Sequence, residues 1–388
     1  MSISRRDQFT GSNNIAKPER LPEGAVVDAV NMDFTVGGKA ELRTGFDLIR
    51  SEPGTRAIYG AGSSLILIAG NKVIKIDEGA DRDLATISQG PVAATWHNSE
   101  LFLNTEIDSL RISTTAKHWA IHEPSVSLEV VEGNLPAGIY KIAVTAVENG
   151  FESGCLPMVV TLDGSQGIRV NVSDTRSCRL YSSVANGQTL YHQGTAHATN
   201  LLGLPVDDTA RLETEQLYPL PFCSILCSHK SLILGSRGNY LFHTRPMLTH
   251  LHNPEQDYFQ FSAPITVIAD VGEGFYVCAD KTYYISGVGS SEVMQRSVFE
   301  FGAIEGTNVT LPDGSASWFC EYGQVIAGRG GEVQLINRAS YSPDTTKTGA
   351  AGFLEHNGNQ MIVTTMRGES NGSRLASSDH WELEVLNP

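Results

Sequence analysis

The chain has 388 residues, of which 41% are hydrophobic and only 18% are charged, and its formal net charge is −15 at pH 7. Its longest basic cluster is Arg5-Arg6, so it lacks the basic patch that phosphate neutralisation requires, which argues against a nucleic-acid-binding protein. The sequence contains neither a run of about 18 apolar residues nor the apolar core of a signal peptide, and we therefore expect no membrane insertion and no secretion.

The first predicted elements lie near the N-terminus. Residues 26–49 alternate apolar and polar side chains around a turn at Gly37-Gly38, which is typical of a β-hairpin. The C-terminal stretch 381–386 (WELEVL) alternates in the same way. We expect these two segments to pair, because strands from both termini can close one sheet and remove its exposed edges.

A pattern of three short apolar strands separated by polar turns recurs six times. The first two copies read AIYGAGSSLILIAGNKVIKI and VAATWHNSELFLNTEIDSLRI, and convincing helical periodicity is nearly absent. A repeated meander of this length is the signature of a β-propeller blade, so the sequence predicts an all-β fold built as a six-bladed β-propeller. The copies begin at Ala57, Val92, Ser224, Val267, Ala316 and Gly352.

The middle strand of each copy should supply the core of its blade, because alternate residues of a strand share one face. We therefore expect buried side chains at Leu65, Leu67, Leu101, Leu103, Leu232, Leu234, Phe275, Val277, Val325, Met361 and Val363.

The second and third copies are separated by about one additional domain of sequence. Residues 135–154 alternate up to Asn149-Gly150, a strong hairpin turn signal, and further short apolar runs follow. About five short strands in roughly a hundred residues favour a small β-sandwich of the immunoglobulin or fibronectin type III kind. We place this inserted domain at 124–220. The propeller would be formed by 1–123, which includes the closing strands, and by 221–388.

Several histidine and aspartate pairs could bear chemistry, but their contexts argue against it. His118 and His122 have the i, i+4 spacing of helical metal ligands, yet the segment is short and ends in a proline, which favours a surface turn. His250 and His252 would share one face of a strand without a third ligand nearby. Asp207-Asp208 is typical of turn formers, since glycosidase carboxylates flank a bond from separate strands.

The glycine-rich segments and the cysteines also give no indication of a phosphate-binding, metal or catalytic site. Residues 60–64, 287–291 and 328–331 lack the strand-loop-helix context of a phosphate-binding loop. The six cysteines lie mostly in apolar strands at spacings that fit neither zinc nor a disulfide framework, which favours buried free thiols. We therefore expect no metal, no cofactor and no enzymatic activity.

Two stretches carry a resemblance to a known family. Residues 9–46, FTGSNNIAKPERLPEGAVVDAVNMDFTVGGKAELRTGF, resemble the opening of tail nozzle or tail-hub proteins of short-tailed phages (podoviruses), and residues 241–287 are similar to a second pattern of that family. The family-like scaffold positions are Gly11, Asn13, Asn14, Asn31, Asp33, Gly37, Gly38, Arg43 and Gly45.

The resemblance implies a structural virion protein of the tail, whose copies form a homo-hexameric ring around the DNA ejection path. Portal-adaptor proteins would lie above it, tail fibres or plug proteins around and below it, and genomic DNA would pass through without specific binding. Assembly would take place in the host cytoplasm. The low share of charged residues agrees with an oligomer, because charge is depleted at interface cores. Two alternatives stay open: a propeller-type glycan hydrolase or lyase, and a propeller that binds a glycan or receptor.

Overall fold

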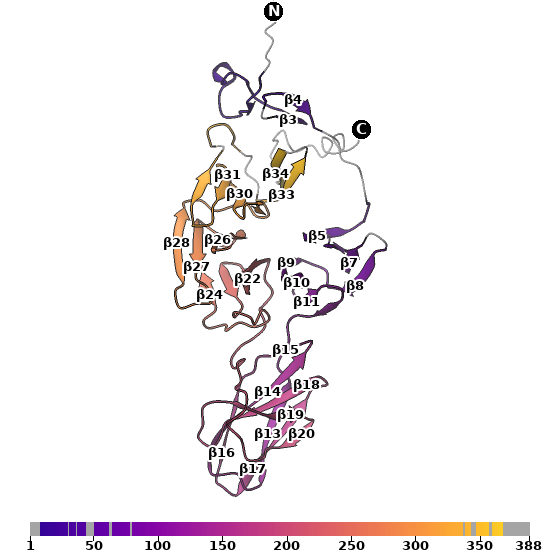
Figure 1. Ribbon diagram of the computed structural model, residues 1–388, viewed down its shortest axis with the longest axis vertical. Coiled ribbons are helices and arrows are strands. Elements are labelled where there is room, and N and C mark those ends of the chain that lie inside the picture. The colour runs from indigo at the N-terminus through magenta and orange to yellow at the C-terminus, as the bar shows by residue number, and fades with distance from the viewer. Residues whose placement is uncertain are drawn as a thin grey trace, which may run out of the picture. The chain divides into compact units, whose positions relative to one another are not determined.

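The computed structural model describes residues 8–29, 31–35, 37–43, 50–61, 64–77, 80–336, 338–342, 347–356 and 359–367 (Figure 1). In these residues every regular element is a β-strand except one turn of 3₁₀-helix, η1 (Pro18–Arg20), so the predicted all-β class is confirmed. The chain separates into two compact units, Pro53–Phe261 on the one hand and Met1–Glu52 with Ser262–Pro388 on the other. The predicted domain limits at 123/124 and 220/221 stay predictions.

Three sheets of the unit 53–261 are antiparallel meanders in which each strand pairs with the next along the chain. Each has four strands, one more than the sequence pattern indicated. The first comprises β5 (Thr55–Ala61), β6 (Ser64–Ala69), β7 (Lys72–Ile76) and β8 (Arg82–Thr86). The second comprises β9 (Ala93–His97), β10 (Glu100–Asn104), β11 (Ser109–Ile112) and β12 (Ala116–His118). The third comprises β21 (Ile225–His229), β22 (Leu232–Arg237), β23 (Tyr240–His243) and β24 (Tyr258–Gln260).

Successive meanders of this unit pack face to face. Ile66 and Ile68 of β6 share a buried core with Leu101 and Leu103 of β10, which joins the first meander to the second. A separate core that includes Phe102 and residues of β21 and β22 joins the second to the third. Successive side chains point to opposite faces of a strand, so β10 contributes Leu101 and Leu103 to one core and Phe102 to the other.

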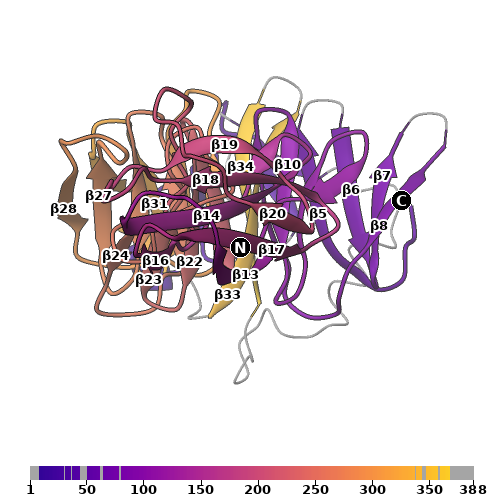
Figure 2. The same ribbon diagram turned by 90° about the horizontal axis from the view of Figure 1, so that it is seen from below.

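The residues between the second and third meanders form two sheets. One has the order β13 (Ser125–Glu132), β17 (Gln166–Ser173), β20 (Thr199–Leu201). The other has the order β15 (Phe151–Glu152), β14 (Gly138–Glu148), β18 (Ser177–Ser182), β19 (Tyr191–Ala196), with β16 (Met158–Leu162) also paired to β14. Side chains of both sheets meet in one buried core, and the two layers can be followed in Figure 2. Asn149 (φ 51°) and Gly150 (φ 85°) make the predicted tight turn between β14 and β15.

The second unit contains two further four-stranded meanders that share a core around Tyr276 and Trp318. They comprise β25 (Val267–Asp270), β26 (Gly274–Cys278), β27 (Thr282–Ser286) and β28 (Met294–Phe299), and β29 (Val309–Thr310), β30 (Ala316–Cys320), β31 (Gly323–Ala327) and β32 (Val333–Leu335). Its described residues also form three two-stranded sheets: parallel β1 (Gly11–Ser12) and β2 (Ala25–Val26), antiparallel β3 (Met32–Phe34) and β4 (Ala40–Leu42), and antiparallel β33 (Thr348–His356) and β34 (Asn359–Arg367).

The sixth sequence copy differs from the others in the described residues. It forms the two-stranded sheet β33–β34 instead of the three strands that the pattern indicates. The C-terminal stretch 381–386 lies outside the described residues, so its pairing with residues 26–49 stays a prediction.

Most of the predicted core positions are buried, but two are wrong. Leu65 is 37% exposed and Val363 is 42% exposed, while Met361 is half-buried. Leu65 lies opposite Gly60 of β5, and Val363 lies opposite Gly352 of β33, so on that side each lacks a partner side chain within its own sheet. The alternation predicted the correct period, but burial of these faces depends on what packs against them.

Replacing Leu234 with alanine should lower the free energy of unfolding by about 2–5 kcal/mol, because the side chain is fully buried and its removal leaves a cavity. Leu204→Ala is the matched control: Leu204 is 72% exposed, and its loss should change stability by less than about 0.5 kcal/mol. Urea denaturation of the full chain measures both. A Leu234→Ala effect as small as the control would show that this face is not a core.

Candidate functional site

The first half of the scaffold motif forms a small folded element. Gly11 lies in β1, and its φ of 115° is in the region that favours glycine. The buried side chain of Asn13 accepts hydrogen bonds from the backbone N–H groups of Ile15 (3.1 Å) and Ala16 (2.9 Å). Asn13 therefore ends the β1 pairing in a turn that is held by its own amide.

Asn14 connects this element to a segment more than 300 residues further along the chain. Its Nδ2 donates to Ser342 O (2.9 Å), its Oδ1 accepts from Ser342 N (2.8 Å), and its backbone N–H donates to Ser340 O (3.0 Å). An amide side chain that donates to and accepts from the backbone of one residue makes the same kind of hydrogen-bond pair as a neighbouring strand would. The N-terminal element is thereby attached to residues 340–342 of its own unit.

The second half of the motif forms the β3–β4 hairpin. Asp33 Oδ1 accepts from Arg43 Nε (3.0 Å) and Nη2 (2.9 Å), and Asn31 O accepts from Arg43 N (3.0 Å) across the strand ends. Gly38 has a φ of 79°, and its carbonyl accepts from the backbone of the segment that leads to β1. Gly37 precedes it in the turn, and Gly45 lies outside the described residues.

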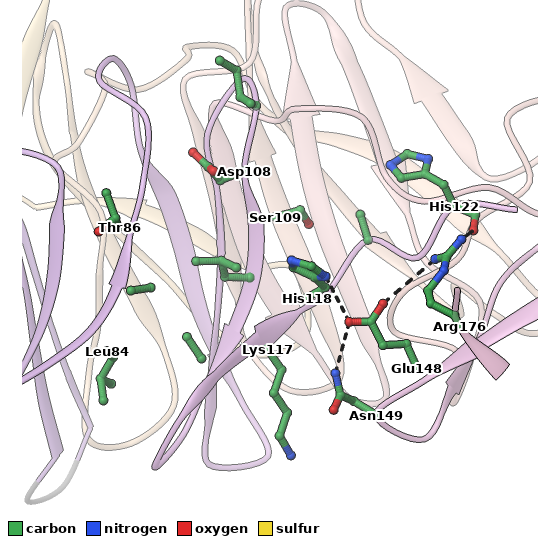
Figure 3. Close-up of a pocket in the computed structure, with 15 residues that line it drawn as sticks. Leu84, Thr86, Asp108, Ser109, Lys117, His118, His122, Glu148, Asn149 and Arg176 are labelled. Carbon is green, nitrogen blue, oxygen red and sulfur yellow. Dashed lines mark hydrogen bonds and ion pairs between the residues drawn. The ribbon is translucent and has the colours of Figure 1, made fainter. Parts of the chain in front are cut away.

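A cavity of about 660 Å³ lies in the unit 53–261, between the first two meanders and the inserted sheets (Figure 3). Its walls come from β8, from β11 and β12, and from the turn after β14. The lining residues that carry charge or an imidazole are Asp108, Lys117, His118, His122, Glu148 and Arg176.

Glu148 is the centre of a polar network in this cavity, and Figure 3 shows it between His118 and Arg176. Its Oε1 contacts His118 Nδ1 at 3.0 Å, and its Oε2 lies 4.0 Å from Arg176 Nη1. Arg176 also pairs with Asp174 at 2.6 Å, and hydrogen bonds from this guanidinium lower the pKa of the Asp174 carboxyl. The network joins the second meander to the inserted sheets across the cavity wall.

Asp108, the other carboxylate of the cavity, is bound by its neighbours. It accepts from Ser88 N (2.6 Å) and Thr105 Oγ1 (2.9 Å). Burial acts to raise the pKa of Asp108, but these hydrogen bonds outweigh it and the pKa is lowered. Both carboxylates are thus used to connect strands, and the pKa of Asp108 is lowered, whereas a general acid needs a raised one.

The structure corrects the geometry expected for two histidine pairs. His118 lies in the strand β12, not in the expected surface turn, and His122 lies in the loop after it; both line the cavity. His250 and His252 are both buried in a loop, not on a strand, and each contacts a backbone carbonyl oxygen. In the part of the chain that the structure describes, no three histidine, cysteine or acidic side chains group as metal ligands.

The cysteines are free, and all but the half-buried Cys227 are buried, as predicted. Burial raises the pKa of Cys155, Cys223 and Cys278 to about 12 in each case, so these thiols stay protonated at neutral pH and are poor nucleophiles. Asp207 and Asp208 are exposed, as expected for turn residues. No described helix has the length and apolar character required to cross a membrane.

The sequence reasoning did not identify the cavity itself. Glu148 was part of the predicted hairpin strand and Arg176 of a loop, and no short-range spacing connects either to His118. Only the packing of the inserted sheets against the second meander brings the three side chains together.

Comparison with known proteins gives no family. No protein-family model and no curated protein matches the chain. Two crystal structures of BBS1N in complex with ARL6DN, soaked with lead and with mercury, are 10% and 9% identical to it, cover 83% and 82% of this chain and 94% of that chain, and have TM-scores of 0.31 and 0.32. An extracellular domain from B. thetaiotaomicron is 11% identical over 73% of this chain and 39% of that chain, with a TM-score of 0.22. TM-scores of this size carry no argument about this chain.

Proposed function

We propose that this protein is a structural component of a short-tailed phage tail, a nozzle or tail-hub protein whose copies form a ring around the DNA ejection path. The observation that carries the proposal is the structural role of the side chains in the scaffold motif. Asn13, Asn14, Asp33 and Arg43 carry the family resemblance, and they are also the residues whose side chains stabilise the N-terminal element. Because the motif side chains stabilise a structural segment, the motif suits a scaffold protein better than an enzyme.

The fold that we propose is a six-bladed β-propeller with an inserted immunoglobulin or fibronectin type III-like sandwich. Five four-stranded antiparallel meanders in the described residues support it, and the β33–β34 sheet would contribute to the sixth blade. The inserted sheets interrupt the series after the second meander, and their shared core supports a sandwich.

The cavity favours this function over a glycan hydrolase. A glycosidase needs one carboxylate free to attack or activate water and another with a raised pKa. Glu148 and Asp108 instead accept hydrogen bonds or ion pairs from neighbouring strands. We propose no catalytic role, cofactor or metal for the chain.

Several large apolar side chains are available for contacts with other subunits. Ile107 is 82% exposed, Leu42 79% and Met247 81%. Exposed apolar groups together with a low charge fraction suit a protein that buries surface in an assembly. In the proposed virion these contacts would form the hexameric ring and attach portal-adaptor and fibre or plug proteins.

The test is the particle mass in solution, combined with DNA binding. Light scattering should give a ring of six times the 41.9 kDa mass of one chain. A ring with −15 on every chain should repel duplex DNA, so a gel-shift titration at low salt should show negligible binding. A monomer at high concentration would contradict the ring. Tight, salt-sensitive DNA binding would contradict a conduit through which DNA slides.

A further inference from the structure

One loop of the third meander, residues 247–253, contacts the segment that leads into the inserted domain and the segment that returns from it. On the incoming side, Trp119 Nε1 donates to Thr249 O (2.8 Å). On the returning side, Tyr218 and His252 exchange backbone hydrogen bonds of 2.9 and 2.8 Å. His252 Nδ1 also donates to Tyr218 O (2.9 Å). Trp119 and His252 are nearly fully buried, so these contacts form an internal joint.

The same 247–253 loop also contacts the inserted domain through His250. Its imidazole stacks on Phe151 of β15, with ring centroids 4.2 Å apart and planes 5° from parallel. The guanidinium carbon of Arg111 lies 3.9 Å from the centroid of the same phenyl ring. Two groups this close to one ring centre must lie on opposite faces, so Phe151 is enclosed between a cation and an imidazole.

The hydrogen bonds of His250 require its neutral form. Since a carbonyl oxygen only accepts, Nε2 must carry the proton that binds Glu152 O at 2.8 Å. Nδ1 is buried and has no hydrogen-bond partner among the described residues. A second proton, on Nδ1, would therefore be a buried donor without an acceptor. Only the Phe151 ring would separate the resulting cation from the Arg111 guanidinium. Burial lowers the pKa of His250, and Arg111 lowers it further, against the opposite effects of the Glu152 carbonyl and carboxylate.

His252 is also nearly fully buried, and its Nδ1 proton is held by the Tyr218 carbonyl. Burial lowers its pKa, and His243 adds to this effect, while the Tyr218 carbonyl and Asp257 act in the opposite direction. The Asp257 carboxylate is already paired with Arg245 at 2.6 Å. The opposing carboxylates therefore do not outweigh burial at either histidine.

We propose that the 247–253 loop is a pH-sensitive joint, in which protonation of His250 and His252 on acidification releases the inserted sandwich from the third meander while the core of each keeps its fold. The proposal does not depend on the tail function. The closed joint requires both histidines to be neutral. It therefore has its full stability at pH values above their ordinary pKa of about 6.5, and it loses stability as the pH drops below that value. Each additional proton bound in the open form favours opening by on the order of tenfold per pH unit.

Hydrogen exchange of the full chain at about pH 7.5 and about pH 5, corrected for the intrinsic exchange rate, tests the proposal. Peptides that cover residues 148–156 and 214–221 should lose protection by at least roughly tenfold at the lower pH. Protection of β14 and β17, in the sandwich core, should not change. In the double variant His250→Gln, His252→Asn, each amide can donate from near the original nitrogen but does not titrate, so protection at the joint should persist at the lower pH.

His197→Gln is the control, because His197 is an exposed histidine of the same inserted domain outside the 247–253 loop, and this variant should respond to acid as the wild type does. Unchanged wild-type protection at the joint would overturn the proposal, as would equal acid loss in the double variant. Should the double variant fail to fold, NMR titration of the wild type decides: pKa values of His250 and His252 at or above the ordinary value would overturn the joint, and lowered values together with the wild-type exchange result would support it.

Discussion

Replacing Gly154 with alanine should destabilise the protein by at least about 4 kcal/mol, an effect at the upper end for a single substitution. Gly154 is buried beside the segment that returns from the inserted domain, where Cys155 forms a parallel bridge to Glu215 and its carbonyl accepts from Gln216 N (2.9 Å). A Cβ at Gly154 would overlap the backbone carbonyl of Leu217. Because the obstacle is backbone, no side-chain rotation relieves it, and two paired segments would have to separate.

Gly203→Ala provides the matched control. A Cβ at Gly203 meets open space and the backbone there needs no positive φ, so the change should alter stability by less than about 0.5 kcal/mol. Thermal and urea denaturation of both variants measure the difference. A Gly154→Ala protein as stable as the control would show that the returning segment is not packed as the structure describes.

Deleting residues 1–50 should abolish folding of the remaining chain or its assembly into a ring. The deletion removes β1 to β4 and, with Asn14, the three hydrogen bonds to residues 340–342. It also removes the Phe9–Phe34 ring contact, whose centroids are 6.2 Å apart. The segment that follows β32 would lose the hydrogen bonds that attach it to the N-terminal element.

A pair of point variants separates this contact from general effects of truncation. Asn14→Ala should cost about 0.5–1.5 kcal/mol, because its side-chain hydrogen bonds to Ser342 N and O are lost at an exposed position. Lys17→Ala, at an exposed position in the same element, should change stability by less than about 0.5 kcal/mol. Denaturation gives the stabilities and light scattering gives the mass. A truncated protein with native stability and native mass would refute the scaffold role of residues 9–46.

Local features of the fold could be predicted from the sequence, because they depend on neighbours along the chain. The alternation in the repeats predicted strands whose register is set by short turns, and Asn149-Gly150 adopts the positive φ values that its residue types permit. The location of the inserted strands followed from the interrupted repeat spacing. The scaffold positions were found from a resemblance, whereas their contacts, such as Asn14 to Ser342, were not predictable from spacing.

Contacts between distant segments were decided only by tertiary structure. A period of two determines that Leu65 and Leu67 share a face, but not whether both are covered, and Leu65 is 37% exposed while Leu67 is 4% exposed. The stack of Arg111, Phe151 and His250 joins three separate elements, and nothing in the local pattern around any of them predicts the others. The environment of such a side chain is determined by segments that are distant in the sequence, and no short stretch of sequence specifies which segments these are.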